Sequence, residues 1–343
     1  MKNVMKPIIV MAAAAFLFFL AGCKKDNIVI TPGPEKQQSP FRDFFSWRQS
    51  LPLPIQKFRL NASKGGTIRG DHGYEFTIMP GTLVDGANNP IAGMVDIELL
   101  EVTNAYEMMA SGAGTWAVNG ILASIGMFSL TITQNGQDVF VNRNQPIQAM
   151  VTANPNAGIE GIWLFRGNAD SIPTVLLEDM GVRWSLVNSN SGFQADTVRN
   201  VWDSVQRQLV KRRCIRFDLN FLRWCNLDKY INNVDGEQIV VEIPGISDHA
   251  DTRVYMYLEQ ENLKGMVSMQ QAGMGADRQR IFNSQNYRLP LGWQIRIIVV
   301  TRDKKGNLFY ETRIITNASG AVHAFKDLKS ISDEDLEAFF KGL

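Results

Sequence analysis

Short segments in which apolar and polar residues alternate place the strongest constraint on how this chain of 343 residues can fold. Tyr74–Ile78, Val95–Leu99 and Phe128–Ile132 all have this pattern. Alternation with a period of two puts the apolar side chains on one face of a strand. Asn135–Gly136 follows the third segment, and this dipeptide favours a tight hairpin because both residues tolerate positive φ. The pattern predicts a mainly β fold made of tandem antiparallel β-sandwich modules.

Two segments have a helical pattern instead. Residues 196–212 are predicted to form a helix because apolar side chains recur there at helical spacing. These side chains are Val198, Val201, Trp202, Val205 and Leu209. A short C-terminal helix is predicted over Ser332–Phe340, where Ser332 can serve as the N-cap and acidic residues occupy the first turn.

The N-terminus has the pattern of a secretion signal. Lys2 and Lys6 precede an apolar run, Ile8–Leu20, that ends in small residues and is too short to span a bilayer comfortably. Residues 1–22 are therefore predicted to be a signal peptide. One interpretation of Cys23 is that it is a chance thiol after an ordinary signal peptide.

The four residues Leu20-Ala-Gly-Cys23 resemble the lipobox of bacterial lipoproteins. In that family the chain is cut just before the cysteine, which is then acylated. The resemblance implies lipidation of Cys23 and anchoring to a membrane through the attached lipid. It also implies an extracytoplasmic location, for which we expect the outer membrane, on its periplasmic or its surface side.

The rest of the chain divides into four predicted parts. Residues 23–40 are polar and rich in proline, which is typical of a tether. Residues 41–155 contain the clearest strand patterns, residues 156–233 form a connecting β/α region, and residues 234–343 form a C-terminal β module that ends in the short helix.

Part of the first module resembles the ZU-five module, a β-sandwich of ankyrins, netrin receptors and zonula occludens proteins. The resemblance rests on Gly65-Gly-Thr67, Phe76–Asp85 and Asn89–Leu99. A version of the module is widespread in lipoproteins of unassigned role in Bacteroidetes. Some members cleave themselves at His-Phe-Ser before a Trp, but Phe221-Leu-Arg-Trp224 lacks the base and the hydroxyl that this reaction needs. The resemblance therefore implies a non-catalytic module.

Composition and motifs limit the possible functions. The chain has 35 Lys and Arg against 34 Asp and Glu, a balance that gives no reason to expect nucleic acid as a partner. His72, His249 and His323 are not at metal-ligand spacing, and His72 and His249, which occur near turns, are expected in solvated loops. No nucleophile elbow, phosphate loop or dinucleotide fingerprint occurs in the sequence, so we expect neither a cofactor nor a metal.

The predicted role is non-catalytic binding or structural support at the cell envelope, with another envelope protein or a polysaccharide as partner. One alternative is a glycan-binding accessory of a polysaccharide uptake system. A less favoured alternative is a hydrolase with a dispersed active site. Trp116 and Trp184 are candidate ligand contacts, whereas Trp163 and Trp293 lie in strand patterns and are expected in the core.

Three further sites have alternatives that the sequence leaves open. Cys214 and Cys225 could form a disulfide or remain buried free thiols. Asp96, Glu98 and Glu101 flank one strand and are expected on an exposed polar face. Three segments resemble the Asp-Ser/Thr-apolar motif that Bacteroidetes use for O-glycosylation. They are Asp170-Ser171-Ile172, Asp196-Thr197-Val198 and Asp203-Ser204-Val205.

Overall fold

In the computed structural model, the described residues are 40–343 except 42, 118–119, 159, 169–180, 188–193, 205, 232–235, 244–248, 261–262, 276–278 and 285–286. Cys23, the predicted signal peptide and nearly all of the predicted tether lie outside the described residues, and so does Ser171. The described residues all belong to one compact unit, 34–343.

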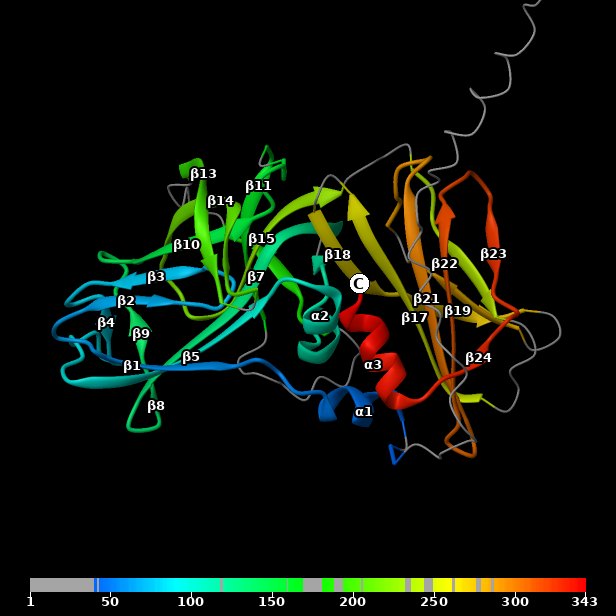
Figure 1. Ribbon diagram of the computed structural model, residues 1–343, viewed down its shortest axis with the longest axis horizontal. Helices are drawn as coiled ribbons and strands as arrows, with labels where there is room; N and C mark the ends of the chain where they lie inside the picture. The colour runs from blue at the N-terminus through cyan, green and yellow to red at the C-terminus, as the bar shows by residue number, and fades with distance from the viewer. Residues whose placement is uncertain are drawn as a thin grey trace, which may run out of the picture. The chain divides into compact units, whose positions relative to one another are not determined.

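The predicted mainly β fold is confirmed (Figure 1). The largest sheet in the described part of the chain has 13 strands. Its strands are β1 (Gln56–Asn61), β5 (Met94–Val102), β6 (Trp116–Ala117), β7 (Gly120–Gln134), β8 (Gln137–Asp138), β11 (Ile162–Gly167), β12 (Trp184–Leu186), β15 (Arg223–Ile231), β17 (His249–Gln260), β18 (Leu263–Ser268), β21 (Gln294–Asp303), β22 (Leu308–Thr316) and β24 (Lys329–Ser330).

Two smaller sheets cover this long sheet and enclose two hydrophobic cores. A five-stranded sheet, in the order β13-β14-β10-β3-β2, encloses the first core, and a four-stranded sheet, β19-β20-β16-β23, encloses the second. A pair of short strands, β4 and β9, lies beside the first core. The bounds of these strands are β2 Gly66–Arg69, β3 Glu75–Ile78, β4 Leu83–Val84, β9 Phe140–Val141, β10 Ile147–Ala153, β13 Gln194–Asp203, β14 Gln208–Leu219, β16 Val240–Ile243, β19 Gln270–Met274, β20 Arg280–Asn283 and β23 Val322–Ala324.

Strand β7 contributes side chains to both cores. Phe128, Leu130 and Ile132 pack in the first core, and Ile121 and Ala123 pack in the second. The inward positions are odd-numbered in the first half of β7 and even-numbered in the second half, so the period-two pattern must shift between the two halves. The register with β15 does shift at this place, as Leu227 pairs with Gly126 and Asp228 with Ser124. This β-bulge keeps both cores on the same face of the long sheet.

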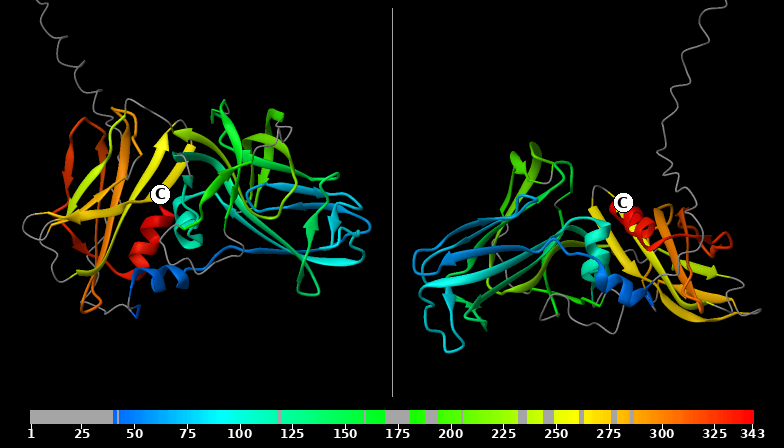
Figure 2. Two further views of the ribbon diagram at one scale, coloured as in Figure 1. Left: turned by 180° about the vertical axis from the view of Figure 1, so that it is seen from behind. Right: turned by 60° about the horizontal axis from the view of Figure 1, so that its bottom comes forward.

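Three short helices lie close to one another (Figure 2). Helix α1 packs Trp47 against Phe340 of α3, with the ring centroids 6.4 Å apart, and the backbone N–H of Phe44 donates to Asp251 at 2.7 Å. Helix α3 begins after Ser332, whose hydroxyl accepts a hydrogen bond from the N–H of Asp335, as predicted. The helices are α1 (Phe44–Ser50), α2 (Ala105–Ser111) and α3 (Asp333–Lys341).

The predicted helix over residues 196–212 is wrong. This segment forms the antiparallel hairpin β13–β14, in which Trp202 pairs with Leu209. Valines are β-branched and favour strands, and β14 also pairs along the whole length of β10. Val198, Trp202 and Leu209 are 43%, 55% and 64% exposed, so the apolar residues do not form the buried stripe that a helix would need.

The segment 156–233, predicted as a connecting region, is not a separate layer. Strands β11 and β15 lie in the long sheet, and β14 pairs with β10 in the five-stranded sheet. Ile215, Phe217 and Leu227 from this segment are buried in the first core. The first sandwich therefore needs residues from β1 through β15.

The predicted hairpin turn at Asn135–Gly136 is confirmed. Both residues have positive φ, 52° and 78°, and Gln134 pairs with Gln137 across the turn. The exposed face of β5 is also as expected, since Asp96 and Glu98 form ion pairs with Arg59 and Lys57 on β1. Glu101, which was expected on that face, is instead buried.

Candidate functional site

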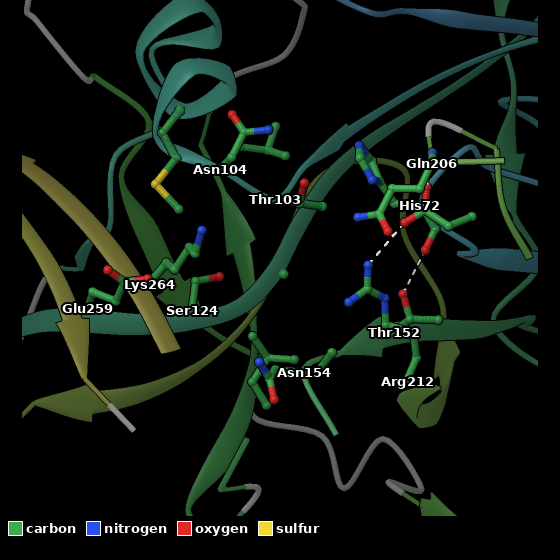
Figure 3. Close-up of a pocket in the computed structure, with 16 residues that line it drawn as sticks. His72, Thr103, Asn104, Ser124, Thr152, Asn154, Gln206, Arg212, Glu259 and Lys264 are labelled. Atoms are coloured by element: carbon green, nitrogen blue, oxygen red, sulfur yellow. Dashed lines mark hydrogen bonds and ion pairs between the residues drawn. The ribbon is translucent and has the colours of Figure 1, made fainter. Parts of the chain in front are cut away.

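A cavity of about 660 Å³ lies beside β7 at the bulge (Figure 3). On one side of β7 the pairing with β5 ends at Met127, and the pairing with β18 begins only at Ser124. The long sheet is therefore interrupted next to Ile125 and Gly126, and the cavity occupies this interruption. Its lining comes from both sandwiches: His72, Val102, Thr103, Asn104, Met108, Ser124, Ile125, Gly126, Thr152, Ala153, Asn154, Asp203, Gln206, Arg212, Glu259 and Lys264.

The buried carboxylate of Glu101 shapes the loop that carries His72. It accepts hydrogen bonds from the backbone N–H of His72 at 2.9 Å and of Tyr74 at 3.2 Å, and from the side chain of Gln56 at 2.9 Å. Burial raises the pKa of Glu101, and these hydrogen bonds offset part of the rise. Gly70 is required in this loop, because a Cβ there would lie 2.5 Å from the Glu101 carboxylate.

His72 is paired with Glu107, at the beginning of α2. The imidazole Nε2 lies 3.4 Å from Oε1 of Glu107. The other carboxylate oxygen accepts from the backbone N–H of Thr103 at 2.6 Å and from its hydroxyl at 3.0 Å. Burial acts to lower the pKa of His72, but the hydrogen bond to Glu107 and the charges of Glu101 and Glu107 outweigh it, so the pKa is raised.

The pKa of Glu107 moves in the opposite direction. Burial acts to raise it, but the hydrogen bonds from His72 and Thr103 outweigh burial and lower the pKa. Both shifts favour the charged forms, the imidazolium of His72 and the carboxylate of Glu107.

Polar groups on the five-stranded sheet complete the same end of the cavity. The guanidinium of Arg212 on β14 lies 3.0 Å from the carboxylate of Asp203, whose side chain is 3% exposed. The hydroxyl of Thr152 donates to the backbone carbonyl of His72 at 2.8 Å. Figure 3 shows His72, Thr152, Gln206 and Arg212 gathered on this side.

The other end of the cavity is formed by β17, β18 and β7. Glu259 and Lys264 are directly opposite on β17 and β18, and Lys264 is opposite Ser124 on β7. Neither Glu259 nor Lys264 has an ion pair within the described part of the chain, so these two charges are available to a ligand.

A buried polar network lies behind Ser124. The Ser124 hydroxyl donates to the Asn226 side chain at 2.8 Å, and the Asn226 amide donates to Asp228. Burial raises the pKa of Asp228 well above its usual range, against the effect of these hydrogen bonds, and so favours the neutral acid. Asn226 and Asp228 both lie on β15 and are 0% exposed.

The predicted ligand contacts Trp116 and Trp184 are wrong, because the two side chains are only 2% and 0% exposed. The Trp184 indole donates to the carbonyl of Gly114 at 2.6 Å and its ring packs edge-on against Trp224. Both side chains lie in the protein interior, and a ligand in solvent therefore cannot reach them. Trp163, expected in the core, is 50% exposed.

Cys214 and Cys225 are buried free thiols, which is one of the two predicted alternatives. Cys214 pairs with Thr152 across β14 and β10, and Cys225 packs in the first core. Of the predicted O-glycosylation sites, Ser204 is exposed in the turn after β13 and Thr197 lies within β13.

No group of three or more His, Cys, Asp or Glu side chains in the described ranges could hold a metal ion. Likewise, no helix within these ranges is long and apolar enough to cross a membrane.

Comparisons with protein-family models, with curated proteins and with solved structures found no match to this chain. The resemblances to bacterial lipoproteins and to the ZU-five module therefore stay predictions. What can be said of function rests on the sequence and on the geometry described above.

Sequence reasoning missed the residues that form the cavity. His72 was expected in a solvated loop, and Glu101 on an exposed face. The sequence did not indicate a site formed by Glu107, Thr152 and Arg212. These residues come close to one another only through pairing between strands that are far apart in sequence. The one local signal was the break in alternation at Ser124-Ile-Gly126, which a strict period of two does not allow.

Proposed function

We propose that this protein is a lipid-anchored binding protein of the cell envelope, without catalytic activity, and that the cavity beside β7 is its ligand site. The Leu20–Cys23 sequence supports the anchor, because it places a cysteine that can be acylated directly after the predicted signal peptide. The cavity supports a small polar ligand with charged groups, because its lining offers charges of both signs and several amides.

One observation carries the choice of binding over catalysis. The hydroxyl and carboxylate groups around His72 that could act as nucleophile or base already have partners within the protein. Glu107 is held by His72 and Thr103, Asp203 by Arg212, and the Thr152 and Ser124 hydroxyls donate to a backbone carbonyl and to Asn226. The Thr103 hydroxyl does donate to Glu107, but no described hydroxyl or thiol is hydrogen-bonded to the imidazole of His72, so the cavity lacks the nucleophile–histidine pair of a catalytic triad.

The ligand that fits this cavity best is a zwitterion, such as an amino acid or a dipeptide. Glu259 and Lys264 can pair with an ammonium and a carboxylate, and the amides of Asn104, Asn154 and Gln206 can bond the remaining polar atoms. No Phe, Tyr or Trp is among the described residues that line this cavity, so it lacks the large flat ring on which a sugar usually stacks.

Two experiments test the proposal. Growth with an alkyne fatty acid should label the wild-type protein and not Cys23→Ala, which should also leave the membrane fraction. For the cavity, saturation-transfer NMR with amino acids, dipeptides and neutral disaccharides should show contacts for the zwitterions. Lys264→Ala should weaken them, and the exposed control Lys57→Ala should not. Recovery of a chemically altered probe, or contacts that Lys264→Ala leaves unchanged, would overturn the proposal.

A glycan-binding accessory is the second candidate. The observation that favours it is the exposure of aromatic side chains away from the cavity, with Trp163 and Trp202 about half exposed. Exposed aromatic rings supply the flat apolar surface on which sugar rings stack.

A further inference from the structure

A second cavity, of about 930 Å³, opens at the end of the first sandwich. Four segments converge there: the turn Val84–Asn88, the segment Asp138–Asn144, Arg166 of β11, and the turn Asn220–Arg223. Loops that meet at one end of a β-sandwich are supported by the rigid sheets and are a common place for recognition. None of the residues that line this cavity lines the cavity beside β7.

The second cavity contains three arginines, of which one is neutralised. The guanidinium of Arg223 lies 2.7 Å from the carboxylate of Asp138 and also donates to the Thr131 hydroxyl at 3.3 Å. Its backbone has a φ of +83°, a conformation that is costly for a residue with a side chain. The two contacts hold Arg223 in place at the start of β15.

The other two arginines, Arg143 and Arg166, have no ion-pair partner among the described residues. The remaining carboxylate in the lining, Asp85, is turned into its own loop and accepts hydrogen bonds from Ala87 and Asn89. The Asp85 carboxylate therefore already has hydrogen-bond partners in its own loop. The arginines in the lining outnumber the aspartates, so the cavity keeps an excess of positive charge.

The guanidinium of Arg166 is positioned by an aromatic ring. It lies 5.4 Å from the centroid of the Phe221 ring, within range of a cation–π interaction. Phe140, also in the lining, is 52% exposed and presents an apolar face to solvent. Arginine can bond a carboxylate or sulfate through two parallel N–H groups, and the side-chain amide of Asn220 adds donor and acceptor atoms for hydroxyl groups.

We propose that this cavity binds an acidic saccharide, with Arg143 and Arg166 on its carboxylate or sulfate group and Phe140 against the face of a sugar ring. The proposal does not depend on the ligand of the cavity beside β7. It assigns to the first sandwich a separate recognition site that takes a different class of ligand.

Calorimetric titration of the full-length protein in detergent tests this proposal. The probes are trigalacturonate for the carboxylate, a 6-O-sulfated disaccharide for the sulfate, maltotriose as the neutral sugar, and inorganic sulfate. We expect one or both acidic saccharides to bind and maltotriose to bind much more weakly. Binding of trigalacturonate alone assigns the site to carboxylates, and binding of the sulfated sugar alone assigns it to sulfates.

The double variant Arg143→Gln/Arg166→Gln should weaken that binding by about tenfold or more, because two charge-assisted contacts are lost. Phe140→Ala should weaken saccharide binding but not any binding of inorganic sulfate. Arg207→Gln, an exposed arginine in the β13–β14 turn, is the matched control and should bind as the wild type does. Lys264→Ala should also leave this binding unchanged, which separates the result from that of the other cavity.

The proposal would be overturned by no binding of either acidic saccharide, by equal binding of maltotriose, or by wild-type affinity in the double variant. Inorganic sulfate that binds as tightly as the saccharides would also overturn it, because the sugar would then contribute nothing. Arg143 and Arg166 are both exposed, so the double variant should fold, and its near-ultraviolet circular dichroism checks this.

Discussion

The imidazole of His72 and the carboxylate of Glu107 are 3.4 Å apart, although their loop and helix are separated by strands β3 to β5 in the chain. The first prediction concerns this pair. Glu107→Gln should lower the pKa of His72, because the hydrogen bond and charge that oppose the effect of burial are lost. NMR titration of the His72 imidazole measures the change. Glu98→Gln, on the exposed face of β5, should leave the pKa as it is, and an unaltered pKa in Glu107→Gln would contradict the pairing.

The second prediction concerns the contribution of His72 to the stability of the protein at different pH values. The pKa of His72 is raised in the folded protein, so its stabilising contribution is fully present below the unfolded value of 6.5 and is lost as the pH rises through the folded pKa. The free energy of unfolding should therefore fall as the pH is raised from 6.5. His72→Gln should remove this part of the fall. Urea unfolding at a series of pH values measures both, and identical pH profiles would count against the prediction.

The third prediction concerns Gly126 at the bulge of β7. A Cβ at this position would lie 1.9 Å from the hydroxyl oxygen of Tyr74, which is buried without a hydrogen-bond partner. Gly126→Ala should destabilise the protein by about 1–3 kcal/mol, because the core must move to accept the methyl group. Tyr74→Phe alone should be close to neutral, since it removes a polar atom that has no partner.

The double variant tests the cause of this effect. If the hydroxyl is the obstacle, Gly126→Ala should cost clearly less in the Tyr74→Phe background, as judged by a double-mutant cycle in urea. Equal costs in the two backgrounds would show that something other than this contact requires the glycine.

The fourth prediction concerns the attachment of α3. The side chain of Arg302 is 1% exposed, and its guanidinium lies 2.6 Å from the carboxylate of Asp333 in the first turn of the helix. Asp333→Ala should cost about 3–5 kcal/mol, because a buried cation is left without its partner. Glu334→Ala, which removes a neighbouring acid of the same turn, is the control and should cost much less. Thermal unfolding compares the two.

The fifth prediction concerns the cysteines. Cys214 and Cys225 are free and buried, and burial raises the pKa of the Cys225 thiol. Both should therefore react slowly with a thiol reagent in the native protein and fully after denaturation without a reductant. Denatured protein that gives no thiol signal until it is reduced would establish a disulfide instead.

Local patterns in the sequence predicted the strands well. Alternation located β3, β5 and the second half of β7, and Asn135–Gly136 located the turn after β7, because these features depend on neighbouring residues. The C-terminal helix was found for the same reason, through the Ser332 N-cap. The helix predicted over 196–212 failed because spacing alone does not separate an amphipathic helix from a hairpin with exposed valines.

The candidate site could not be predicted in the same way. Glu101 lies on β5 only three residues from the exposed Glu98, and its burial depends on the backbone N–H groups of His72 and Tyr74, which fold over it. Arg212 reaches Asp203 because the two residues are on paired strands that the sequence suggested were one helix. Contacts of this kind are set by strand pairing at long range, which short sequence windows do not contain.

Strand β7 gives its side chains to two cores at once, and this has a consequence for how a ligand can be taken up. Receptors with two separately folded lobes close on their ligand by a hinge between the lobes. Here the element that would have to bend is β7 itself, which continues from one sandwich into the other and pairs with β15 on both sides of the bulge, so hinge closure would break this pairing. A ligand of the proposed site would therefore enter and leave through the existing opening, and its selection would depend on the shape of the unliganded protein.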